Sequence, residues 1–350
     1  METKTILVLF GGNSSEYSVS LQSSFAVLTH LPEKRWKVIP IGITADGTWF
    51  WYRGPLNRIP NDTWKDNPND LTSVVVSPDP KVHGILSLTD HGVSAIRVDC
   101  AFPVLHGKNG EDGTVQGLLA LAGIPIVGCG TLASALCMDK DRAHKLTSLC
   151  GVLVPQSVVI EQYDCWDSAL NFTKTIGYPL FVKPVKAGSS YGITKVSRPE
   201  ALLPAVNFAF QYDNQVIIEE AIDGFEVGCA VIGTDKLIIG EVDEIELSGG
   251  FFDFTEKYTL KTAAIHVPAR INQALADRVK KTAETIYRAL GCTGFARVDL
   301  FVTQEGHIVF NEVNTIPGFT EHSRFPGMMK AAGISFDEMV SMIVEEAVKS

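Results

Sequence analysis

The stretch ARVDLFVTQEGHIVFNEVN, residues 296–314, contains two apolar runs separated by the turn-forming sequence Gln304-Glu305-Gly306. This pattern predicts an antiparallel hairpin of two strands, 296–302 and 307–313. Side chains along a strand alternate between the two faces of the sheet, and paired residues of a hairpin share a face. If the loop has an even number of residues, one face therefore carries Arg297, Asp299, Phe310, Glu312 and Asn314.

This face combines an arginine, two carboxylates and an amide in a short patch. Mg²⁺ commonly binds one or two protein carboxylates and completes its shell with phosphates and water, so the patch suits this ion. A solvated strand face is the alternative interpretation. However, the strand continues into the loop NTIPG at 314–318, and the alternate residues Val298, Leu300, Val309 and Val313 are apolar. The hairpin therefore favours a magnesium site.

Upstream of the hairpin, the last third of the chain is rich in antiparallel signals. The predicted elements are strands 216–220, 226–232 and 237–245, an amphipathic helix at 272–290 and a closing helix at 336–348. The segment VIIEEAIDGFE, residues 216–226, resembles a hinge between two sheets. Backbone groups of such a linker can contact the edge of an adenine ring, and a carboxylate such as Glu226 suits a ribose. An ordinary strand–turn–strand is an equally good interpretation of this segment alone.

The middle third contains two lysines that could contact phosphate. Lys183 ends an apolar strand, and the small-residue loop PVKAGSSYG (184–192) that follows could direct backbone N–H groups and hydroxyls at phosphate. The spacing of a Walker A loop is absent, and a strand follows instead of a helix. The loop is also typical of a simple hairpin, and Lys140, at the start of a predicted helix, could equally lie on the surface. The predicted elements here are helices 139–150 and 167–176 and strands 155–160, 178–183 and 193–196.

The first third alternates strands and helices. The predicted order is strand 5–10, helix 18–30, strand 98–105, helix 114–122 and strand 124–127, with a loop-rich insertion at 48–80. Two successive strand–loop–helix units predict a parallel, doubly wound sheet. The turn at Gly11-Gly12 lacks the GxGxxG spacing of a dinucleotide-binding turn. An NAD-dependent oxidoreductase is therefore a weaker interpretation, and it also leaves the carboxylate-bearing hairpin unexplained.

Composition argues against several classes of partner. The 350 residues carry a formal net charge of −10 without a dense stripe of Lys or Arg, so we expect neither nucleic acid nor an anionic membrane as a partner. The seven cysteines include no CxxC pair, which indicates small core residues in a reducing compartment. The apolar run at 6–10 is too short for a signal peptide or for a membrane span of about 20 residues, so we expect a cytoplasmic protein.

Eight segments resemble, in the same order, motifs of the D-alanine–D-alanine ligase family of the ATP-grasp superfamily. They are LFGGNSSEYSVSLQS (9–23), HGKNGEDGTVQG (106–117), MDKDRAHK (138–145), FVKPVKAGSSYGI (181–193), IIEEAIDGFEVG (217–228), FFDFTEKY (251–258), ARVDL (296–300) and FNEVNTIPGFTEHSR (310–324). The resemblance covers essentially the whole chain and implies an α/β ATP-grasp fold. A Rossmann-like domain with a doubly wound parallel sheet is expected at 1–128, followed by two α+β domains, 129–221 and 222–350, that sandwich ATP.

The resemblance also implies roles for individual residues. Contacts with ATP are implied for Lys140, Lys183, Glu219, Ala221, Ile222, Glu226, Lys257 and Phe310. The implied ligands of Mg²⁺, or of Mn²⁺ as an alternative ion, are Asp299, Glu312 and Asn314, which match the face predicted from the hairpin. Catalytic roles are implied for Glu16, Ser189, Lys257, Tyr258, Arg297 and the backbone N–H of Gly318. Contacts with the amino-acid substrates are implied for Glu16, Val19, His106, Asp243, Phe252, Ser323 and Arg324.

The implied reaction has two steps. The γ-phosphoryl group of ATP passes to the carboxylate of the first D-alanine, and the amine of the second substrate then attacks the acyl phosphate. Glu16 would bind the ammonium group of the first substrate, and Arg297 and Gly318 would stabilise the oxyanion. Because an acyl phosphate exposed to water would hydrolyse, a lid is expected, and residues 249–261 are the candidate.

The chain departs from the D-alanine–D-alanine pattern at the position after His322-Ser323. Such ligases typically carry Leu there, whereas this chain has Arg324, as the vancomycin-resistance ligases do. A guanidinium can donate a hydrogen bond to a serine hydroxyl, although a surface arginine is the alternative interpretation. Phe252, where alanine ligases often have Tyr, also favours the resistance group. Lys257-Tyr258 resembles members that add D-alanine or D-serine, because members that add D-lactate have a His-containing loop.

Together these features favour a ligase that joins D-alanine to D-serine, for modified peptidoglycan precursors and vancomycin resistance. The alternative is a D-alanine–D-alanine ligase of normal cell-wall synthesis. The family implies a homodimer. A non-catalytic nucleotide-binding module is a weaker interpretation, because the chain retains Glu16, Lys183, Ser189, Lys257, Arg297, Asp299 and Glu312.

Overall fold

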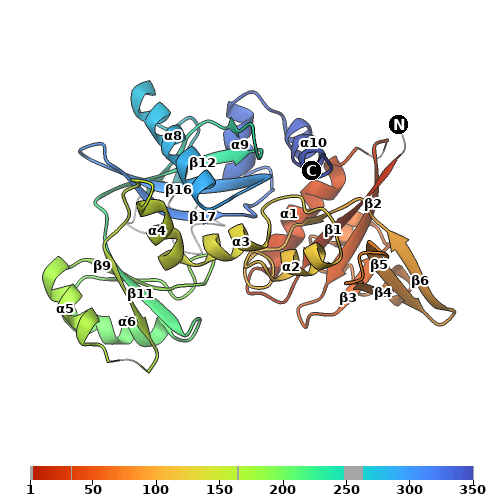
Figure 1. Cartoon of the computed structure of the whole chain (residues 1–350), viewed down its shortest axis with the longest axis horizontal. Coiled ribbons are helices and arrows are strands. Elements are labelled where there is room, and N and C mark those ends of the chain that lie inside the picture. Colours follow the sequence, from red (N-terminus) through yellow and green to blue (C-terminus); the bar gives the residue numbers. More distant parts are fainter. Residues whose placement is uncertain (1–2, 33, 164, 248–262, 350) are drawn as a thin grey trace.

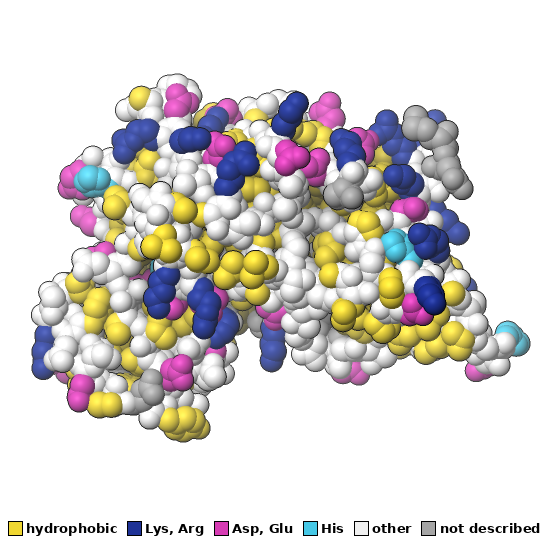
Figure 2. All heavy atoms as spheres, viewed as in Figure 1, with side chains coloured by type: hydrophobic (Ala, Val, Ile, Leu, Met, Phe, Trp, Pro, Cys, Tyr) yellow, Lys and Arg dark blue, Asp and Glu magenta, His cyan; other side chains and the backbone are white. Residues whose placement is uncertain are grey.

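The structure, a computed structural model, describes residues 3–32, 34–163, 165–247 and 263–349. Three sheets of seven, four and six strands organise the chain. In Figure 1 the first sheet lies at the right, the second at the lower left and the third at the upper left. Side chains of both charges are interspersed over the face shown in Figure 2. In the described part of the chain, no helix combines the length and the apolar character needed to cross a membrane.

The first sheet is built around β1 (Lys4–Gly11), an apolar strand with residues 6–10 fully buried. It pairs in parallel with β7 (Cys100–Pro103), as the sequence predicts, and with β2 (Trp36–Ile43), a strand that the sequence did not predict. Beyond β2 the sheet continues with antiparallel strands, which are β3 (Trp49–Tyr52), β4 (Leu71–Val76), β5 (Gly84–Thr89) and β6 (Gly92–Arg97). The sheet is therefore mixed, because the loop-rich insertion forms hairpins. The predicted strand at 124–127 is wrong, since this segment forms only one bridge, between Ala101 and Ile126.

Helices cover this sheet and lead out of it. They are α1 (Tyr17–His30), α2 (Thr114–Leu121), α3 (Thr131–Met138) and α4 (Lys140–Ser148), with the short 3-10 turns η1 (Leu56–Arg58) and η2 (Pro68–Asp70) between β3 and β4. Helix α2 ends before Gly123, whose positive φ of 70° is the left-handed conformation that stops a helix. The side chain of Asp139 caps α4 by accepting a hydrogen bond from the backbone N–H of Arg142.

The second sheet is fully antiparallel and has the strand order β10–β9–β11–β8. Its strands are β8 (Ser157–Glu161), β9 (Leu180–Pro184), β10 (Thr194–Val196) and β11 (Gln215–Glu220). Two helices and one 3-10 turn accompany it, namely α5 (Asp167–Ile176), η3 (Pro199–Ala201) and α6 (Leu202–Ala209). Both helices contribute to a separate hydrophobic core with this sheet. The second sheet thus has a hydrophobic core of its own, formed with α5 and α6.

The third sheet is antiparallel and carries the predicted hairpin. Its strands are β12 (Gly224–Ile232), β13 (Ile238–Ile239), β14 (Asp243–Leu247), β15 (Ala263–His266), β16 (Phe295–Thr303) and β17 (Ile308–Asn314). Its helices are α8 (Gln273–Ala289), α9 (Arg324–Ala331) and α10 (Phe336–Ala347). Helix α10 begins with a capping box in which Ser335 and Glu338 exchange hydrogen bonds.

The register of the β16–β17 hairpin decides which side chains share a face. Arg297 pairs with Asn314 and Asp299 pairs with Glu312, so these four side chains share a face as the sequence predicts, although the loop between Val302 and Ile308 has an odd number of residues. A bulge then shifts the register, so that Leu300 pairs with Phe310. The prediction that Phe310 shares the charged face is therefore wrong. Because one extra residue reverses the alternation, Phe310 lies fully buried in the core on the opposite face.

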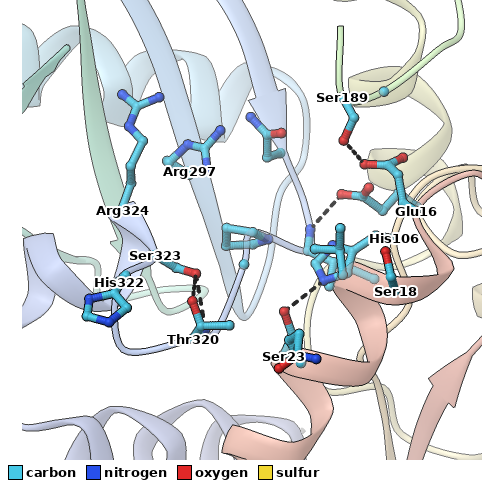
Figure 3. Close-up of a pocket in the computed structure, with 18 of the residues that line it drawn as sticks. Glu16, Ser18, Ser23, His106, Ser189, Arg297, Thr320, His322, Ser323 and Arg324 are labelled. Atoms are coloured by element: carbon cyan, nitrogen blue, oxygen red, sulfur yellow. Dashed lines mark hydrogen bonds between the residues drawn. The ribbon is translucent and has the colours of Figure 1, made fainter. Parts of the chain in front are cut away.

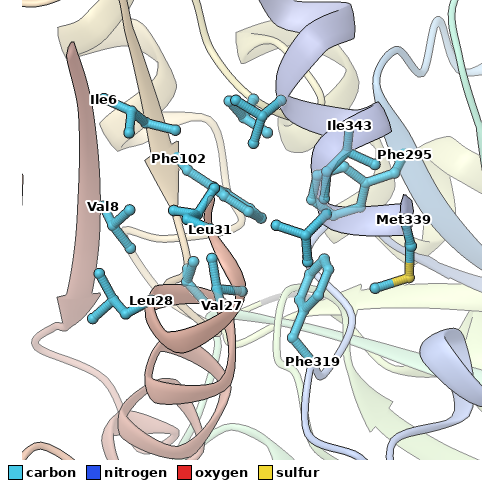
Figure 4. Packing of buried hydrophobic residues seen from close by; sticks show 14 of the residues in the cluster. Ile6, Val8, Val27, Leu28, Leu31, Phe102, Phe295, Phe319, Met339 and Ile343 are labelled. Carbon is cyan, nitrogen blue, oxygen red and sulfur yellow. The ribbon is translucent and has the colours of Figure 1, made fainter. Parts of the chain in front are cut away.

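One hydrophobic core joins the two ends of the chain. Phe102 of β7 contacts Phe295 and Phe319 edge-on, with ring centroids 5.9 and 5.6 Å apart. The same cluster includes residues of α1, α9 and α10, so the closing helices pack against the first sheet (Figure 4). This packing places the loop after β17 beside the N-terminal end of α1, where the larger cavity lies.

Candidate active site

The larger cavity has a volume of about 580 Å³ and lies where α1, the glycine-rich turn after β7 and the loop after β17 meet (Figure 3). It collects most of the side chains that the sequence predicted for substrate binding and catalysis. The predicted residues that line it are Glu16, Val19, His106, Ser189, Arg297, Asn314, Gly318, Ser323 and Arg324. These residues come from segments up to about three hundred positions apart, so the fold brings together what the sequence only suggested.

Glu16 is the residue that precedes α1, and its side chain makes no capping hydrogen bond with the helix. Its carboxylate instead accepts a hydrogen bond from the hydroxyl of Ser189, which lies in the small-residue loop after β9. The backbone of Gly107 approaches it so closely that a Cβ there would lie 2.2 Å from Glu16 Oε2. Gly107 also has a positive φ of 72°, so the backbone conformation favours glycine, and any side chain here would displace the Glu16 carboxylate.

Two further titratable groups lie beside Glu16. The ring of His106 is within hydrogen-bond distance of Ser23, with Nε2 and Oγ 3.1 Å apart, and burial lowers the pKa of His106 to about 4. The carboxyl of Glu111 accepts hydrogen bonds from the backbone N–H groups of Gly107 at 2.8 Å and Ile316 at 3.2 Å. Burial and the nearby charge of Glu16 raise the pKa of Glu111 to about 8.

Glu111 was not among the predicted site residues, although it lies inside the quoted motif HGKNGEDGTVQG. An acidic residue in a glycine-rich turn is typical of an exposed loop, so the sequence offers little indication that Glu111 belongs to the site. Only the fold shows that it is buried. At neutral pH a protonated Glu111 leaves Glu16 as the negative group of this wall, which suits an ammonium group as ligand.

The opposite wall of the cavity contains a buried arginine. Arg324, at the start of α9, donates to both carboxylate oxygens of Asp243, with Nε–Oδ2 and Nη2–Oδ1 distances of 2.7 and 2.8 Å. Its Nη1 donates to Glu226 at 3.0 Å and lies 3.2 Å from Asp299 Oδ1. Only 8% of Arg324 is exposed, which excludes the alternative of a surface arginine. Burial opposes its charge, but Asp243 and Asp299 outweigh that effect and raise the pKa of Arg324.

The charged face of the hairpin separates this cavity from a second one. Arg297 holds Asp299 through Nε and Nη2, at 2.8 and 2.7 Å from its two oxygens, and the Asn314 amide donates to Asp299 at 2.9 Å. Glu312 lies beside them and 3.9 Å from the ammonium of Lys140. Within the described ranges no group of three or more His, Cys, Asp or Glu side chains could hold a metal ion. Two carboxylates and one amide oxygen nevertheless fit Mg²⁺ that completes its shell with phosphate and water.

The second cavity has a volume of about 470 Å³ and lies between the second and third sheets. Lys183 reaches it from β9 and forms a 2.5 Å ion pair with Glu219, while Lys140 donates to the backbone carbonyl of Ala187 at 2.8 Å. Burial opposes the charge of Glu219, but Lys183 and His144 lower its pKa. The predicted nucleotide-binding residues that line this cavity are Lys140, Lys183, Glu219, Ala221, Ile222 and Glu226.

Two aromatic residues that line the second cavity were not predicted from the sequence. Phe181 and Phe301 both line it, whereas the predicted Phe310 does not. Phe181 precedes Lys183 by two residues and Phe301 follows Asp299 by two residues, so strand alternation could have identified both. Two buried ammonium groups and two aromatic walls suit the phosphates and the base of a nucleotide. Lys257, Tyr258, Phe252 and the expected lid at 249–261 lie outside the described residues.

Comparisons with family models, curated proteins and solved structures all point to the same family. The family model "D-ala D-ala ligase N-terminus" matches residues 5–129, and "D-ala D-ala ligase C-terminus" matches residues 146–345. The vancomycin C-type resistance protein VanC1 of Enterococcus gallinarum is 44% identical over 97% of both chains. The D-alanine–D-alanine ligase of Caldicellulosiruptor bescii is 39% identical over 98% of this chain and 95% of its own. The solved structure of the VanG D-Ala:D-Ser ligase from Enterococcus faecalis is 55% identical, with a TM-score of 0.92 over 99% of this chain and 100% of that chain.

Proposed function

The chain belongs to the D-alanine–D-alanine ligase family, and on that premise we propose that it joins D-alanine to D-serine at the expense of ATP. The observation that carries the choice of D-serine is Arg324 at one wall of the larger cavity, where the fully buried Asp243 behind it holds its guanidinium. The similarity to the VanG D-Ala:D-Ser ligase supports the same choice. A product of this kind would serve modified peptidoglycan precursors and vancomycin resistance.

Arg324, held in place by Asp243, selects the second substrate by polarity. The hydroxyl of D-serine can accept a hydrogen bond from the guanidinium, whereas the methyl group of D-alanine cannot. A site that is built for a hydroxyl discriminates strongly against an analogue without one, because its buried polar groups then lack their partner. Phe252 would complete the pocket. D-Lactate is the weakest candidate for the second substrate, because this chain has Lys257-Tyr258 where members that add D-lactate have a His-containing loop.

The chain's own residues divide the work of the reaction between the two cavities. Glu16, supported by Ser189, holds the ammonium group of the first D-alanine, and the neutral His106 and Glu111 leave that contact without a competing charge. Lys140 and Lys183 bind the phosphates of ATP. Arg297 and the backbone N–H of Gly318 stabilise the oxyanion, and Lys257 and Tyr258 complete the catalytic set. Asp299, Glu312 and Asn314 would hold Mg²⁺, which neutralises phosphate charge when bound.

The test is product analysis. ATP-dependent phosphate release is measured with D-alanine alone, with D-alanine plus D-serine and with D-alanine plus D-lactate, and each product is identified by mass spectrometry. We expect D-alanyl-D-serine to dominate in the second mixture. If D-alanyl-D-alanine alone forms in every mixture, the enzyme is a D-alanine–D-alanine ligase and the role of Arg324 in D-serine selection is wrong.

Two variants make this test specific. Arg324→Leu should shift preference from D-serine towards D-alanine, since it replaces the polar wall by an apolar one. Arg288→Leu removes an exposed arginine of α8, whose partner Glu284 lies one turn away, and should leave selectivity unchanged. Unchanged selectivity in the Arg324 variant would contradict the proposal. The family also supports a homodimer, which light scattering of the purified protein would test.

A further inference from the structure

We infer that Arg324 couples the second-substrate pocket to the nucleotide cavity, so that occupancy of one site changes the affinity of the other. This inference rests on the proposed ligase reaction, in which the two cavities bind the amino acids and ATP. It goes beyond selection of D-serine, because it assigns Arg324 a contribution to nucleotide binding as well.

The contacts of one guanidinium group span the two cavities. Arg324 itself lines the larger cavity, where Nε and Nη2 donate to Asp243. Its Nη1 donates at 3.0 Å to Glu226, which lines the second cavity, and lies 3.2 Å from Asp299. A planar guanidinium has a fixed geometry of donors. A displacement at its Asp243 edge is therefore transmitted to the carboxylates at its Nη1 edge.

The third sheet leaves a passage for this contact at Gly228. In the sheet Gly228 pairs with Asp243 on β14 and with Asp299 on β16, so it lies between the two carboxylates. A Cβ at this position would lie 2.3 Å from Arg324 Nη2 and 2.7 Å from Asp243 Oδ1. Any side chain there would therefore collide with the guanidinium. The absence of a side chain at Gly228 allows Arg324 to lie across β12 and reach Glu226.

Competition between the arginines and the bound ligands for the same carboxylates provides the free energy of coupling. Arg324 and Arg297 are two buried cations that share Asp299, and Arg324 also pairs with Asp243 and Glu226. A ribose that binds to Glu226, or a cation near Asp299, competes with Nη1 for these oxygens. The guanidinium must then rely more on Asp243 and on a ligand in the second-substrate pocket. The coupling is reciprocal, because the factor by which a nucleotide changes the affinity for the amino acid equals the factor for the reverse effect.

The experiment measures binding without turnover. Isothermal titration calorimetry gives the Kd of the Mg²⁺ complex of the non-hydrolysable β,γ-imido analogue of ATP in the absence and presence of D-serine, with D-alanine at a concentration that fills the first-substrate site but not the second. The ratio of the two Kd values is the coupling factor. For the wild-type chain we expect a factor of about 5 or more, at the lower end of the typical range for coupled sites. A wild-type factor of 1 would overturn the inference.

Three variants assign the coupling to Arg324. Arg324→Lys keeps the charge but cannot contact Asp243 and Glu226 together, so the coupling factor should fall towards 1. Glu226→Gln leaves the Arg324–Asp243 pair intact and should also reduce the factor, even if the nucleotide Kd itself rises. Arg288→Lys, on the exposed side of α8, is the matched control and should keep the wild-type factor. A wild-type factor in both Arg324→Lys and Glu226→Gln would overturn the inference.

The outcome is independent of which second substrate the enzyme prefers. The titrations are repeated with a large excess of D-alanine in place of D-serine, so that the second-substrate site is filled by the alternative substrate. A chain that makes only D-alanyl-D-alanine but shows Arg324-dependent coupling refutes the proposed D-serine specificity and supports the coupling. A chain that makes D-alanyl-D-serine without any coupling gives the reverse result.

Discussion

Removal of the Arg324 side chain should destabilise the protein well beyond the loss of its packing. Asp243 is fully buried, and its two carboxylate oxygens accept bidentate hydrogen bonds from Arg324. Arg324→Leu removes the bidentate partner of this carboxylate and one contact each of Glu226 and Asp299. Loss of one partner of a buried ion pair typically costs about 3–5 kcal/mol. Asp299 keeps Arg297 and Asn314, so we expect a value near the lower end, about 3 kcal/mol.

The assay is urea denaturation followed by circular dichroism. The free energy of unfolding of Arg324→Leu is compared with those of Asp243→Asn and of the double variant. The double variant removes the unpaired charge together with its partner, so it should be less destabilised than the sum of the two single variants by roughly 2 kcal/mol. Additive effects, or a loss below about 0.5 kcal/mol in Arg324→Leu, would refute the assignment of a tightly paired, buried arginine.

Three further predictions follow from the same structure. The folded protein retains the Glu111 proton up to a pKa of about 8, whereas an unfolded chain loses it near the ordinary pKa of 4.5, so the free energy of unfolding should fall as pH rises from 6.5 to 8. In thermal melts Glu111→Gln should flatten this dependence on pH. An unchanged slope would contradict the burial of Glu111. Gly107→Ala should displace Glu16 and raise the KM for the first D-alanine at least tenfold in steady-state assays, and a wild-type KM would contradict the close approach of Gly107 to Glu16. Phe319→Ala, in a fully buried site, should cost about 3–5 kcal/mol of unfolding free energy in urea, whereas the exposed Leu132→Ala should cost less than about 0.5 kcal/mol, and equal losses would show that the shared core contributes little.

The parts of the fold that depend on local pattern could be predicted from the sequence. Alternation along β16 places Arg297 and Asp299 on one face, as expected, but the loop between Val302 and Ile308 has an odd number of residues, so it is the bulge in β17 that brings Glu312 and Asn314 opposite them. The buried strand β1 followed by α1 was also recognisable, because a short apolar run before a glycine turn and a helical segment is a local signal. The family motifs then supplied Glu16, Ser189 and the lysines, which the structure brings to the two cavities.

The bulge in β17 could not be predicted, because distant contacts set it. The backbone N–H of Phe310 donates to the carbonyl of Leu153 at 2.8 Å, and the carbonyl of Asn311 is 2.8 Å from Nε2 of His144. Neither partner is near β17 in the sequence. These contacts draw Phe310 into the core beside the ring of His144, at a centroid distance of 5.2 Å. The alternation rule therefore fails across this bulge, which changes the face of every β17 residue beyond it.

Other misses have the same physical origin. Helix α6 contains Pro204 and a nearly uniform apolar sequence, so its helical period is hidden. The contact of Arg324 with Glu226 joins residues 98 positions apart, and only the crossing of α9 over β12 creates it. Burial of Glu111 depends on the loop after β17. Residue type and spacing thus suggested which groups carry the chemistry, whereas tertiary packing decided which of them meet.

The core that joins the first sheet to the closing helices also sets an order of events during synthesis. Residues of β1 and α1 leave the ribosome early, but α10, which packs on α1, is made about three hundred residues later. At ribosomal rates of about 5–20 residues per second, that interval is roughly 15–60 s. For this time α1, which itself packs on β1, lacks the helix that covers it in the folded protein. Until α10 has emerged, the nascent N-terminal part therefore exposes apolar surface that the complete fold buries.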